Sequence, residues 1–373
     1  MSYELPLDQR SMVLDEHRNG FYRRALEQVI GPESVVMDLG AGLGILGFIA
    51  ASLGAKKVLL VEPKTNQAAA RQIAAENGLE HKVEFIASTA EQLLSEVKVD
   101  IITSVFTGNF LLEEDLLPSL FLARDRFLKP AGVLIPDRAV MVVVPVSMGD
   151  FYDKHINRWA DGSQGITHGA MLPLARNSLY MDSFSAAEFT PLATPKKIRS
   201  LDFHTASVAD CHEEVSFQIR EKAQIDGFLC WFDARMGDEW LSTSPKAPKT
   251  HWSQVFMPVN RSNLETEANV SLRIDRSEFG EWHWRFTTAQ GSQQYSSFLS
   301  APTTVTELRR RSESYRPVLS VEGRAGQFVL SKFGEQSTVS EIASELQANF
   351  PELFADESAA LRFVQEIAGS FGE

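Results

Sequence analysis

An acid followed by alternating glycines is the most chemically informative pattern in this sequence. An apolar run leads into Asp38, and glycines follow at every second position, at Gly40, Gly42 and Gly44. Because glycine has no side chain, such a stretch can turn sharply and approach a ligand closely. Glu62 ends the next apolar run, about 20 residues further on, where an acid can accept hydrogen bonds from both ribose hydroxyls. The pattern predicts a nucleoside-binding turn.

The position of the acid indicates which nucleoside is expected. Gly42, Gly44 and Gly47 also satisfy the G-x-G-x-x-G fingerprint of dinucleotide enzymes. That fingerprint places its first glycine directly after the strand and seats a pyrophosphate on the helix N-terminus. Asp38 stands at this turn instead, and its carboxylate would repel a diphosphate but suits the sulfonium and ammonium of S-adenosylmethionine. A dehydrogenase and a glycine-rich turn without a ligand remain alternatives.

Short apolar segments alternate with helical patterns between residues 35 and 138. We expect strands at 35–39, 57–62, 83–88, 99–105 and 132–137, and helices at 43–53, 66–77 and 113–128. This alternation predicts a Rossmann-like, doubly wound α/β domain with ligands at the carboxyl ends of the parallel strands. Glu62, Glu91 and the loop at 104–114 fall at those ends.

The remaining segments show other patterns of apolar residues. The spacing of apolar residues predicts helix over 10–30, within an N-terminal segment, 1–34, that closes the cofactor site. Period-two patterns predict a β-barrel-like domain over 139–305, interrupted at about 150–190 by an ordered insertion or a dimerisation arm. Residues 316–373 carry two short β-like runs, 318–321 and 328–330, followed by helical patterns, which predict a small α+β, winged-helix-like unit.

Composition narrows the possible partners and locations. The net charge of −13 disfavours a nucleic-acid partner and favours a basic protein or peptide. Cys211 and Cys230 lie far apart without metal-ligand spacing, so we expect neither a disulfide scaffold nor a metal site. The N-terminus has no signal-like apolar core and no run approaches the length of a membrane span, so we expect a cytoplasmic protein.

Four separated stretches, in the right order, resemble the protein arginine methyltransferase family. They are residues 12–18, the glycine turn with Glu62, residues 104–117, and residues 241–252, which end in Thr250, His251 and Trp252. The resemblance spans roughly residues 10 to 300. It implies an S-adenosylmethionine-dependent N-methyltransferase that acts on a protein or peptide side chain, and a homodimer formed through the insertion.

The resemblance also implies residue roles. Arg18 would pair with the carboxylate of the cofactor, and Glu91 would lie near its adenine amino group. Asp38 and the three glycines would line its methionine and ribose, and Glu62 would bind the ribose hydroxyls. His251 would reach back to Asp15, and this pair would take up the released proton. Phe106 and Trp252 would contact the substrate.

The substrate loop departs from the family pattern. Two glutamates hold the substrate guanidinium in the family, and they align here with Val105 and Glu114. Glu114 would orient the nucleophile, and Glu113 is a candidate replacement for the missing acid. The acceptor is then either arginine in a rearranged loop or a less charged group: imidazole, amide, amine or carboxylate. A small-molecule methyltransferase and a non-catalytic cofactor-binding scaffold are the alternative functions.

The end of the chain carries a second resemblance. Residues 333–371 are similar to the small domain that presents precursor peptides in pyrroloquinoline quinone biosynthesis. Thr338 and Glu341 form the sequence signature of a capping box. The resemblance implies that this unit would bind a leader peptide by strand addition, so that the substrate would be a ribosomally made peptide.

Overall fold

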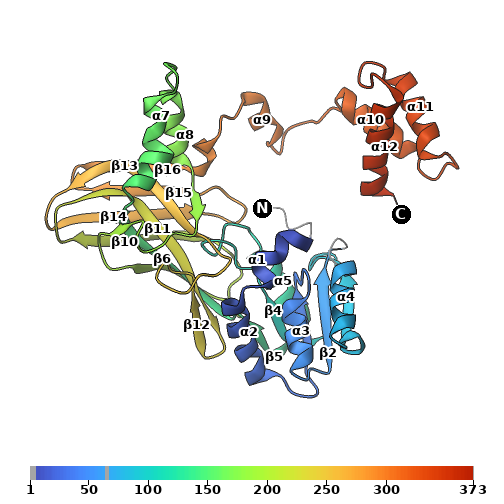
Figure 1. Ribbon diagram of the computed structural model, residues 1–373, viewed down its shortest axis with the longest axis horizontal. Helices are drawn as coiled ribbons and strands as arrows, with labels where there is room; N and C mark the ends of the chain where they lie inside the picture. The colour runs from blue at the N-terminus through green and yellow to red at the C-terminus, as the bar shows by residue number, and fades with distance from the viewer. Residues whose placement is uncertain (1–5, 64–66, 373) are drawn as a thin grey trace. The chain divides into compact units, whose positions relative to one another are not determined.

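The computed structural model describes residues 6–63 and 67–372 (Figure 1). The chain forms two compact units, Met1–Pro302 and Thr303–Glu373. The first unit contains an α/β domain and an antiparallel β domain that share one hydrophobic core. Asn66, where one helix was predicted to begin, lies outside the described residues.

The N-terminal segment is helical but interrupted. A 3₁₀ turn, η1 (Pro6–Gln9), leads into α1 (Arg10–Val13), and α2 (Glu16–Val29) follows. The predicted continuous helix breaks before α2 because Asp15 caps it: its side chain accepts a hydrogen bond from the Arg18 amide at 2.9 Å. The carboxylate of Asp15 is thereby fixed at the start of α2.

The α/β domain confirms the predicted parallel sheet. Its strands are β1 (Val35–Leu39), β2 (Lys57–Glu62), β3 (Val83–Ala87), β4 (Val99–Ser104) and β5 (Leu128–Ile135), in the order β3-β2-β1-β4-β5. Its helices are α3 (Ile45–Ser52), α4 (Gln67–Glu76), the short η3 (Glu80–Lys82) and α5 (Leu117–Phe127). Asp38 on β1 pairs with Leu60 on one side and Thr103 on the other, so it lies in the middle of the sheet. Helix α5 begins four residues later than predicted because residues 105–116 form an irregular loop.

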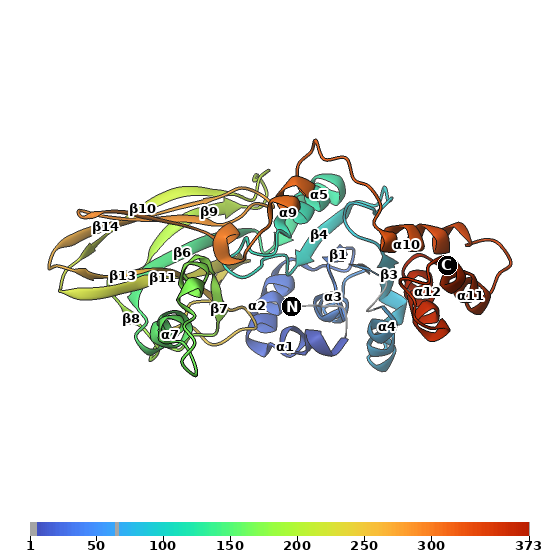
Figure 2. The same cartoon turned by 90° about the horizontal axis from the view of Figure 1, so that it is seen from above.

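The β domain consists of two antiparallel sheets. One follows the order β7-β13-β11-β6-β8, with β12 paired to β11 and β9 paired to β6, and the other follows β10-β14-β15-β16. The strands are β6 (Arg138–Ser147), β7 (Tyr180–Asp182), β8 (Thr190–Pro191), β9 (Lys196–Asp202), β10 (Cys211–Ile219), β11 (Ala223–Met236), β12 (Glu239–Ser242), β13 (Gln254–Leu264), β14 (Ala268–Arg276), β15 (His283–Thr288) and β16 (Gly291–Ser296), before a 3₁₀ turn, η6 (Ser297–Ser300). Figure 2 shows the long strands of both sheets running alongside one another. The period-two apolar residues of β14 are buried in the shared core, as the alternation predicted.

The insertion after β6 is ordered and helical. It contains α6 (Asp150–Tyr152), a π-helical turn η4 (Asp153–Asn157), α7 (Arg158–Asp161), a 3₁₀ turn η5 (Gly169–Met171) and α8 (Leu172–Asn177). Helices α7 and α8 stand out from the sheets of the β domain (Figure 1). Tyr152, Ile156 and Ala175 pack on valines of β6, so the base of the insertion is continuous with a second hydrophobic cluster.

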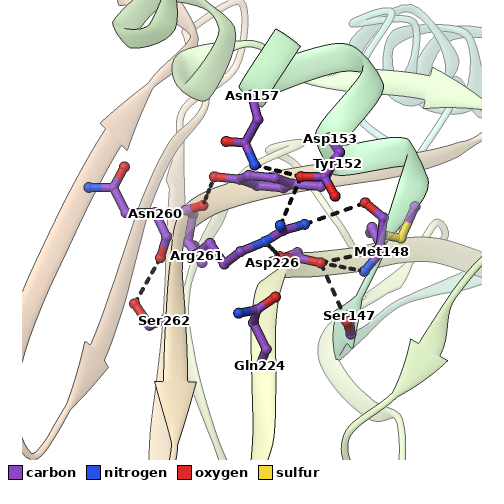
Figure 3. Close-up of polar contacts among 12 residues, drawn as sticks. Ser147, Met148, Tyr152, Asp153, Asn157, Gln224, Asp226, Asn260, Arg261 and Ser262 are labelled. Atoms are coloured by element: carbon purple, nitrogen blue, oxygen red, sulfur yellow. Dashed lines mark hydrogen bonds and ion pairs between the residues drawn. The ribbon is translucent and has the colours of Figure 1, made fainter. Parts of the chain in front are cut away.

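A buried ion pair fixes the base of this insertion (Figure 3). Asp226 is fully buried and accepts hydrogen bonds from the Met148 amide at 2.7 Å and from Arg261 Nε at 2.6 Å. Arg261 also donates to Asp153 at 2.8 Å, and its guanidinium lies 4.7 Å from the ring centroid of Tyr152. These contacts join β11 and β13 to the start of the insertion.

The terminal unit is helical, which corrects the expected α+β fold. It contains α9 (Val305–Arg310), α10 (Val321–Ser331), α11 (Val339–Asn349) and α12 (Glu357–Phe371). The predicted run at 328–330 lies inside α10, and the run at 318–321 ends at its first residue. Ser320 caps this helix, and Ala325 and Val329, four positions apart, are buried on one face, so the helical period prevails over the local β propensity. The capping box of Thr338 and Glu341 is confirmed at the start of α11.

Candidate active site

A cavity of about 440 Å³ lies at the carboxyl ends of β1, β2 and β4. The N-terminal helices, the α/β domain and the segment before β13 all contribute to its wall. The structure brings most of the predicted site residues to this wall, namely Arg18, Gly40, Gly42, Glu62, Glu91, Phe106, Glu114, His251 and Trp252. Asp15, Asp38, Gly44 and Glu113 are not among its lining residues.

The glycine turn forms the floor of the cavity, and a side chain at any of its three glycines would clash with a neighbouring residue. Gly40 and Gly42 adopt φ angles of +68° and +54°, in the left-handed region that favours glycine. A Cβ atom at Gly40 would lie 2.1 Å from the ring of Phe106, and one at Gly42 would lie 2.3 Å from Gln9 Oε1. Gly44, which precedes the first residue of α3, has a φ angle of +88°, and a Cβ atom there would lie 2.8 Å from the ring of Phe48.

Asp38 lies behind this turn, and only one of its two carboxylate oxygens is hydrogen-bonded within the described residues. Its Oδ2 accepts a hydrogen bond from the Gly47 amide at 2.7 Å, whereas its buried Oδ1 has no hydrogen-bond partner among the described residues. Burial raises the pKa of Asp38 to about 7, and the nearby charge of Glu62 adds to this effect, whereas the Gly47 amide opposes it. Glu62 accepts a hydrogen bond from the Gly42 amide at 3.0 Å, which ties the end of β2 to the turn.

Arg18 offers a buried guanidinium to the cavity. The residue is only 1% exposed, and its Nη2 donates to the Met12 carbonyl at 2.7 Å and to Asn19 Oδ1 at 2.7 Å. Its Nη1 is buried without a hydrogen-bond partner among the described residues. Burial lowers the pKa of Arg18, but an arginine stays protonated in any protein environment. A ligand with a carboxylate for Arg18 and a cation near Asp38 fits these unmatched groups, and S-adenosylmethionine has both.

Two cavity residues were not anticipated from the sequence. Gln9 accepts a hydrogen bond from the Leu43 amide at 2.9 Å and packs against Gly42. The hydroxyl of Ser119 donates to Glu91 Oε1, and this hydrogen bond lowers the pKa of Glu91. A single polar residue near the start of a helix has no periodicity or characteristic spacing, so the sequence alone could not predict that Gln9 and Ser119 belong to the cavity.

The predicted contact between His251 and Asp15 is confirmed. The backbone amide of His251 donates to Asp15 Oδ2 at 2.8 Å, and its Nδ1 lies 3.2 Å from the same oxygen. Burial lowers the pKa of His251, which favours the neutral imidazole. Burial alone would raise the pKa of Asp15, but hydrogen bonds from His251 and the Arg18 amide lower it overall. With Nδ1–H directed at Asp15, Nε2 keeps its lone pair.

We call the segment at 104–116 the acceptor loop. Residues just before β13 hydrogen-bond to its first half. Trp252 Nε1 donates to the Thr107 carbonyl at 2.6 Å, and the Ser253 amide donates to Asn109 Oδ1 at 2.8 Å. The hydroxyl of Tyr22 on α2 donates to the Ser104 carbonyl at 2.7 Å. The loop is therefore fixed from both domains.

The second half of the acceptor loop is held by β14 and the segment before β15. Arg276, only 3% exposed, donates to both carboxylate oxygens of Asp115 at 2.9 and 2.7 Å. The indole of Trp282 donates to Glu113 Oε2 and stacks on Phe110 at a centroid distance of 5.3 Å. These anchors hold a backbone in which Phe110, Leu111 and Asp115 have φ angles of 47°, 69° and 51°, which is unfavourable for residues with side chains.

The two adjacent glutamates of this loop point in different directions. Glu114 lines the cavity, whereas Glu113 is bonded to Trp282 and is not among the lining residues. Burial raises the pKa of Glu113 to about 7. The prediction that Glu113 replaces the missing substrate-loop acid is therefore not supported by its position. Arg276 and Trp282 were missed because contacts across more than 160 positions leave no local sequence signal.

Within residues 6–63 and 67–372, no group of three or more His, Cys, Asp or Glu side chains is placed to hold a metal ion. None of the helices there is long and apolar enough to cross a bilayer.

Comparisons with known proteins agree with this architecture. Residues 36–132 match the family described as methyltransferase domain, and residues 137–285 match the arginine methyltransferase oligomerization subdomain. Protein arginine N-methyltransferase 6 of Danio rerio is 30% identical over 282 residues, covering 70% of this chain and 80% of the relative. Protein arginine N-methyltransferase PRMT10 of Arabidopsis thaliana is 30% identical over 318 residues, covering 76% and 83%.

A solved structure extends the comparison to three dimensions. The PRMT1 enzyme–prozyme complex of Trypanosoma brucei, determined with AdoHcy, has a chain that superposes with a TM-score of 0.72 at 26% identity. The superposition covers 79% of this chain and 99% of the other. Sequence relatives and fold agree over both domains of the first unit. This chain belongs to the protein arginine N-methyltransferase family.

Proposed function

We propose that this protein uses S-adenosylmethionine to methylate a side-chain nitrogen of a protein or peptide. The observation that carries the proposal is the arrangement of one cavity. The unmatched guanidinium nitrogen of Arg18 and the glycine turn belong to its wall, and so do the carboxylate of Glu114 and the imidazole of His251. One cavity thus offers groups for a cofactor and groups for an acceptor.

The cofactor side of the cavity fits S-adenosylmethionine residue by residue. Arg18 would bind its carboxylate through a charge-assisted hydrogen bond, and the unmatched Oδ1 of Asp38 would favour its cationic part. Glu62 would accept hydrogen bonds from the ribose hydroxyls, and Glu91 would bind near the adenine amino group. When bound, this cofactor supplies a methyl group activated by attachment to a positively charged sulfur.

The acceptor side would orient a nucleophile and manage its proton. Methyl transfer needs the acceptor lone pair aligned about 3–3.5 Å from the methyl carbon, which is mostly a matter of positioning. Glu114 would accept a hydrogen bond from the acceptor nitrogen and reduce its positive charge. Nε2 of His251 would take up the released proton, and the carboxylate of Asp15 would stabilise the imidazolium that results. Phe106 and Trp252 would exclude water from the acceptor.

The chemical class of the acceptor depends on Val105. Glu114 is the only carboxylate that the acceptor loop contributes to the lining within the described residues, and Val105 and Phe106 form an apolar wall beside it. A buried guanidinium that lacks a second charged partner would lose about 1.5–3 kcal/mol of charge-assisted hydrogen bonding. This supports a less charged acceptor, such as imidazole, amide or amine, over an arginine held by a rearranged loop.

Intact-mass analysis tests the proposal most directly. Peptides encoded beside the gene would be incubated with enzyme and cofactor, and a gain equal to one methyl group would be mapped to a single residue by fragmentation. We expect Glu114→Gln to abolish turnover while calorimetry shows unchanged cofactor binding. Glu113→Gln is the matched control with a smaller effect. Unchanged methyl transfer by Glu114→Gln would contradict the role of this residue.

Assays of cofactor binding and of turnover distinguish the two alternative functions. A non-catalytic scaffold would bind S-adenosylmethionine but form no S-adenosylhomocysteine with any peptide pool. A small-molecule methyltransferase would form it with metabolite extracts but not with peptides.

The insertion supports a homodimer as the working assembly. It lies inside the stretch, residues 137–285, that matches an oligomerization subdomain, and its α7–α8 region exposes Trp159, Ile166 and Met171. Light scattering coupled to size exclusion tests this proposal. A dimer that becomes monomeric in a Trp159→Glu and Ile166→Glu double variant is the expected result.

The terminal unit supports a second, more specific proposal. It has a hydrophobic core of its own, as expected of an adaptor that binds a leader peptide. Strand addition is not the binding mode, because the segment expected to supply its strands ends at or lies within α10. We expect removal of residues 303–373 to raise KM for a full precursor peptide and to leave KM for a short acceptor peptide unchanged.

A further inference from the structure

A second cavity, of about 820 Å³, lies in the β domain and shares no lining residue with the active-site cavity. Four cationic side chains line it, from β9, from the turn between β10 and β11, and from the segment after β12: Lys196, Arg220, Lys222 and Lys246. We call it the basic groove. Glu221 is the only acid among its lining residues in the described chain. The groove is therefore positively charged, although the protein as a whole has a net charge of −13.

The groove combines available cations with an apolar floor. Lys196 and Lys222 are engaged, the first with the Ser216 carbonyl at 2.7 Å and the second with Glu265 at 2.7 Å. Arg220 and Lys246 are exposed and form no ion pair with any described residue. Apolar side chains such as Leu192, Phe217 and Trp231 also line the groove. Such a surface suits an anionic, partly apolar polymer.

A series of smaller cavities follows the chain from this groove to the active site. Ser244 and Pro245 line the basic groove and also a cavity of about 200 Å³. That cavity shares Lys249 and Thr250 with a third, of about 420 Å³, which borders Asp15 and His251. His251 in turn lines the active-site cavity. Residues of the segment at 244–251 therefore line each of the cavities between the basic groove and the proposed catalytic pair, Asp15 and His251.

We infer that the basic groove binds an acidic stretch of the same extended peptide whose acceptor side chain enters the active site. This inference rests on the proposed function, because it assigns a recognition element to that peptide. Lys246 and His251 are five positions apart in the sequence. An extended chain spans at most about 3.3–3.6 Å per residue, so these residues lie within about 18 Å of each other. The acidic residues that meet Lys246 would therefore stand within about five positions of the acceptor.

Charge complementarity favours a peptide over a nucleic acid as the occupant. The protein as a whole has a net charge of −13, so a polyanion that extends beyond the groove would be repelled. A short run of Asp and Glu residues extends no further than the groove. Its apolar neighbours in the peptide would contact the floor.

Fluorescence anisotropy on the full chain, saturated with S-adenosylhomocysteine, tests the inference. The probe is a fluorescein-labelled peptide with a block of alternating Asp and Leu residues, and the reference is the same peptide with Asn for Asp. We expect salt-sensitive binding of the acidic peptide alone. An Arg220→Glu, Lys246→Glu double variant should weaken it about tenfold or more at low ionic strength. Lys197→Glu, which reverses an exposed charge outside the groove, should change it less than twofold.

The outcomes separate this inference from the proposed function. Equal binding of the acidic and neutral peptides, or equal effects of the groove and Lys197 variants, would overturn the inference even if methyl transfer is intact. Tighter binding of a single-stranded oligonucleotide of matched charge would also overturn it. In turnover assays, the double variant should raise KM for peptides with the acidic block and leave kcat for short peptides unchanged. Calorimetry with S-adenosylhomocysteine reports the active site independently.

Discussion

The imidazole of His251 and the carboxylate of Asp15 are in contact although they are 236 positions apart, with Nδ1 3.2 Å from Oδ2. The same carboxylate caps α2, so two substitutions separate its roles. Asp15→Asn keeps one oxygen for the cap but removes the charge and the acceptor that faces His251, and we expect a moderate loss of thermal stability with turnover lowered by about 10²-fold or more. Asp15→Ala should in addition destabilise the protein by about 1 kcal/mol. Thermal denaturation and S-adenosylhomocysteine formation measure the two effects, and wild-type turnover in Asp15→Asn would contradict the proposed role.

Arg18→Lys should weaken cofactor binding strongly. Lysine cannot retain the contacts of Arg18 with Met12 and Asn19 and also present a second nitrogen to the cavity. Loss of a charge-assisted hydrogen bond worth about 1.5–3 kcal/mol corresponds to a rise in Kd of roughly 10- to 150-fold. Calorimetry with S-adenosylhomocysteine measures this change. Methylthioadenosine, which lacks the carboxylate, is the control and should bind both proteins equally.

Cofactor affinity should depend on pH through Asp38. The pKa of Asp38 is raised to about 7 from the ordinary value of 3.8, so the folded protein favours the protonated carboxyl. This contribution to folding stability is complete below pH 3.8 and is lost as the pH rises through about 7. The ionised form, which prevails above pH 7, attracts a cationic ligand. We therefore expect cofactor Kd to rise by up to about tenfold per pH unit as pH falls below 7. Asp38→Asn should bind more weakly and lose this dependence, and a flat wild-type profile would refute the prediction.

The contacts of Arg276 and Trp282 with the acceptor loop predict a kinetic effect without a cofactor effect. Trp282→Phe keeps the stacking on Phe110 but removes the hydrogen bond to Glu113, and Arg276→Lys removes the two-point contact with Asp115. Because the loop backbone is unfavourable by itself, we expect Glu114 to lose its position and kcat to fall about tenfold or more. Steady-state kinetics with calorimetry checks this. A parallel loss of cofactor binding would indicate general destabilisation instead.

The terminal unit should unfold as a separate cooperative unit. Its hydrophobic cluster contains only residues of Thr303–Glu373. Thr338→Ala removes the hydroxyl that accepts a hydrogen bond from the Glu341 amide at the start of α11, and should lower the unfolding free energy of this unit by about 1 kcal/mol. Scanning calorimetry should then show one shifted transition and one unchanged transition. A uniform shift of all the heat absorption would show that the two units unfold together.

Local patterns were sufficient for the parts of the fold that depend on neighbouring residues. The five parallel strands follow from continuous apolar runs, and the glycine turn follows from residues within a few positions of Asp38. The error at 318–330 arose where β-branched residues and glycines suggested strands but the buried positions followed a helical period. Periodicity over a whole segment, rather than the propensity of a few residues, decided that structure.

The sequence by itself determined the nucleoside turn and its acid, because sharp turns and ribose contacts need particular residues at short spacing. It also indicated the pairing of Asp15 with His251, but only through resemblance to a family. Which of the adjacent Glu113 and Glu114 faces the cavity was decided by tertiary structure alone. Arg276 and Trp282 hold the loop from more than 160 positions away, and such contacts exist only once the chain has folded.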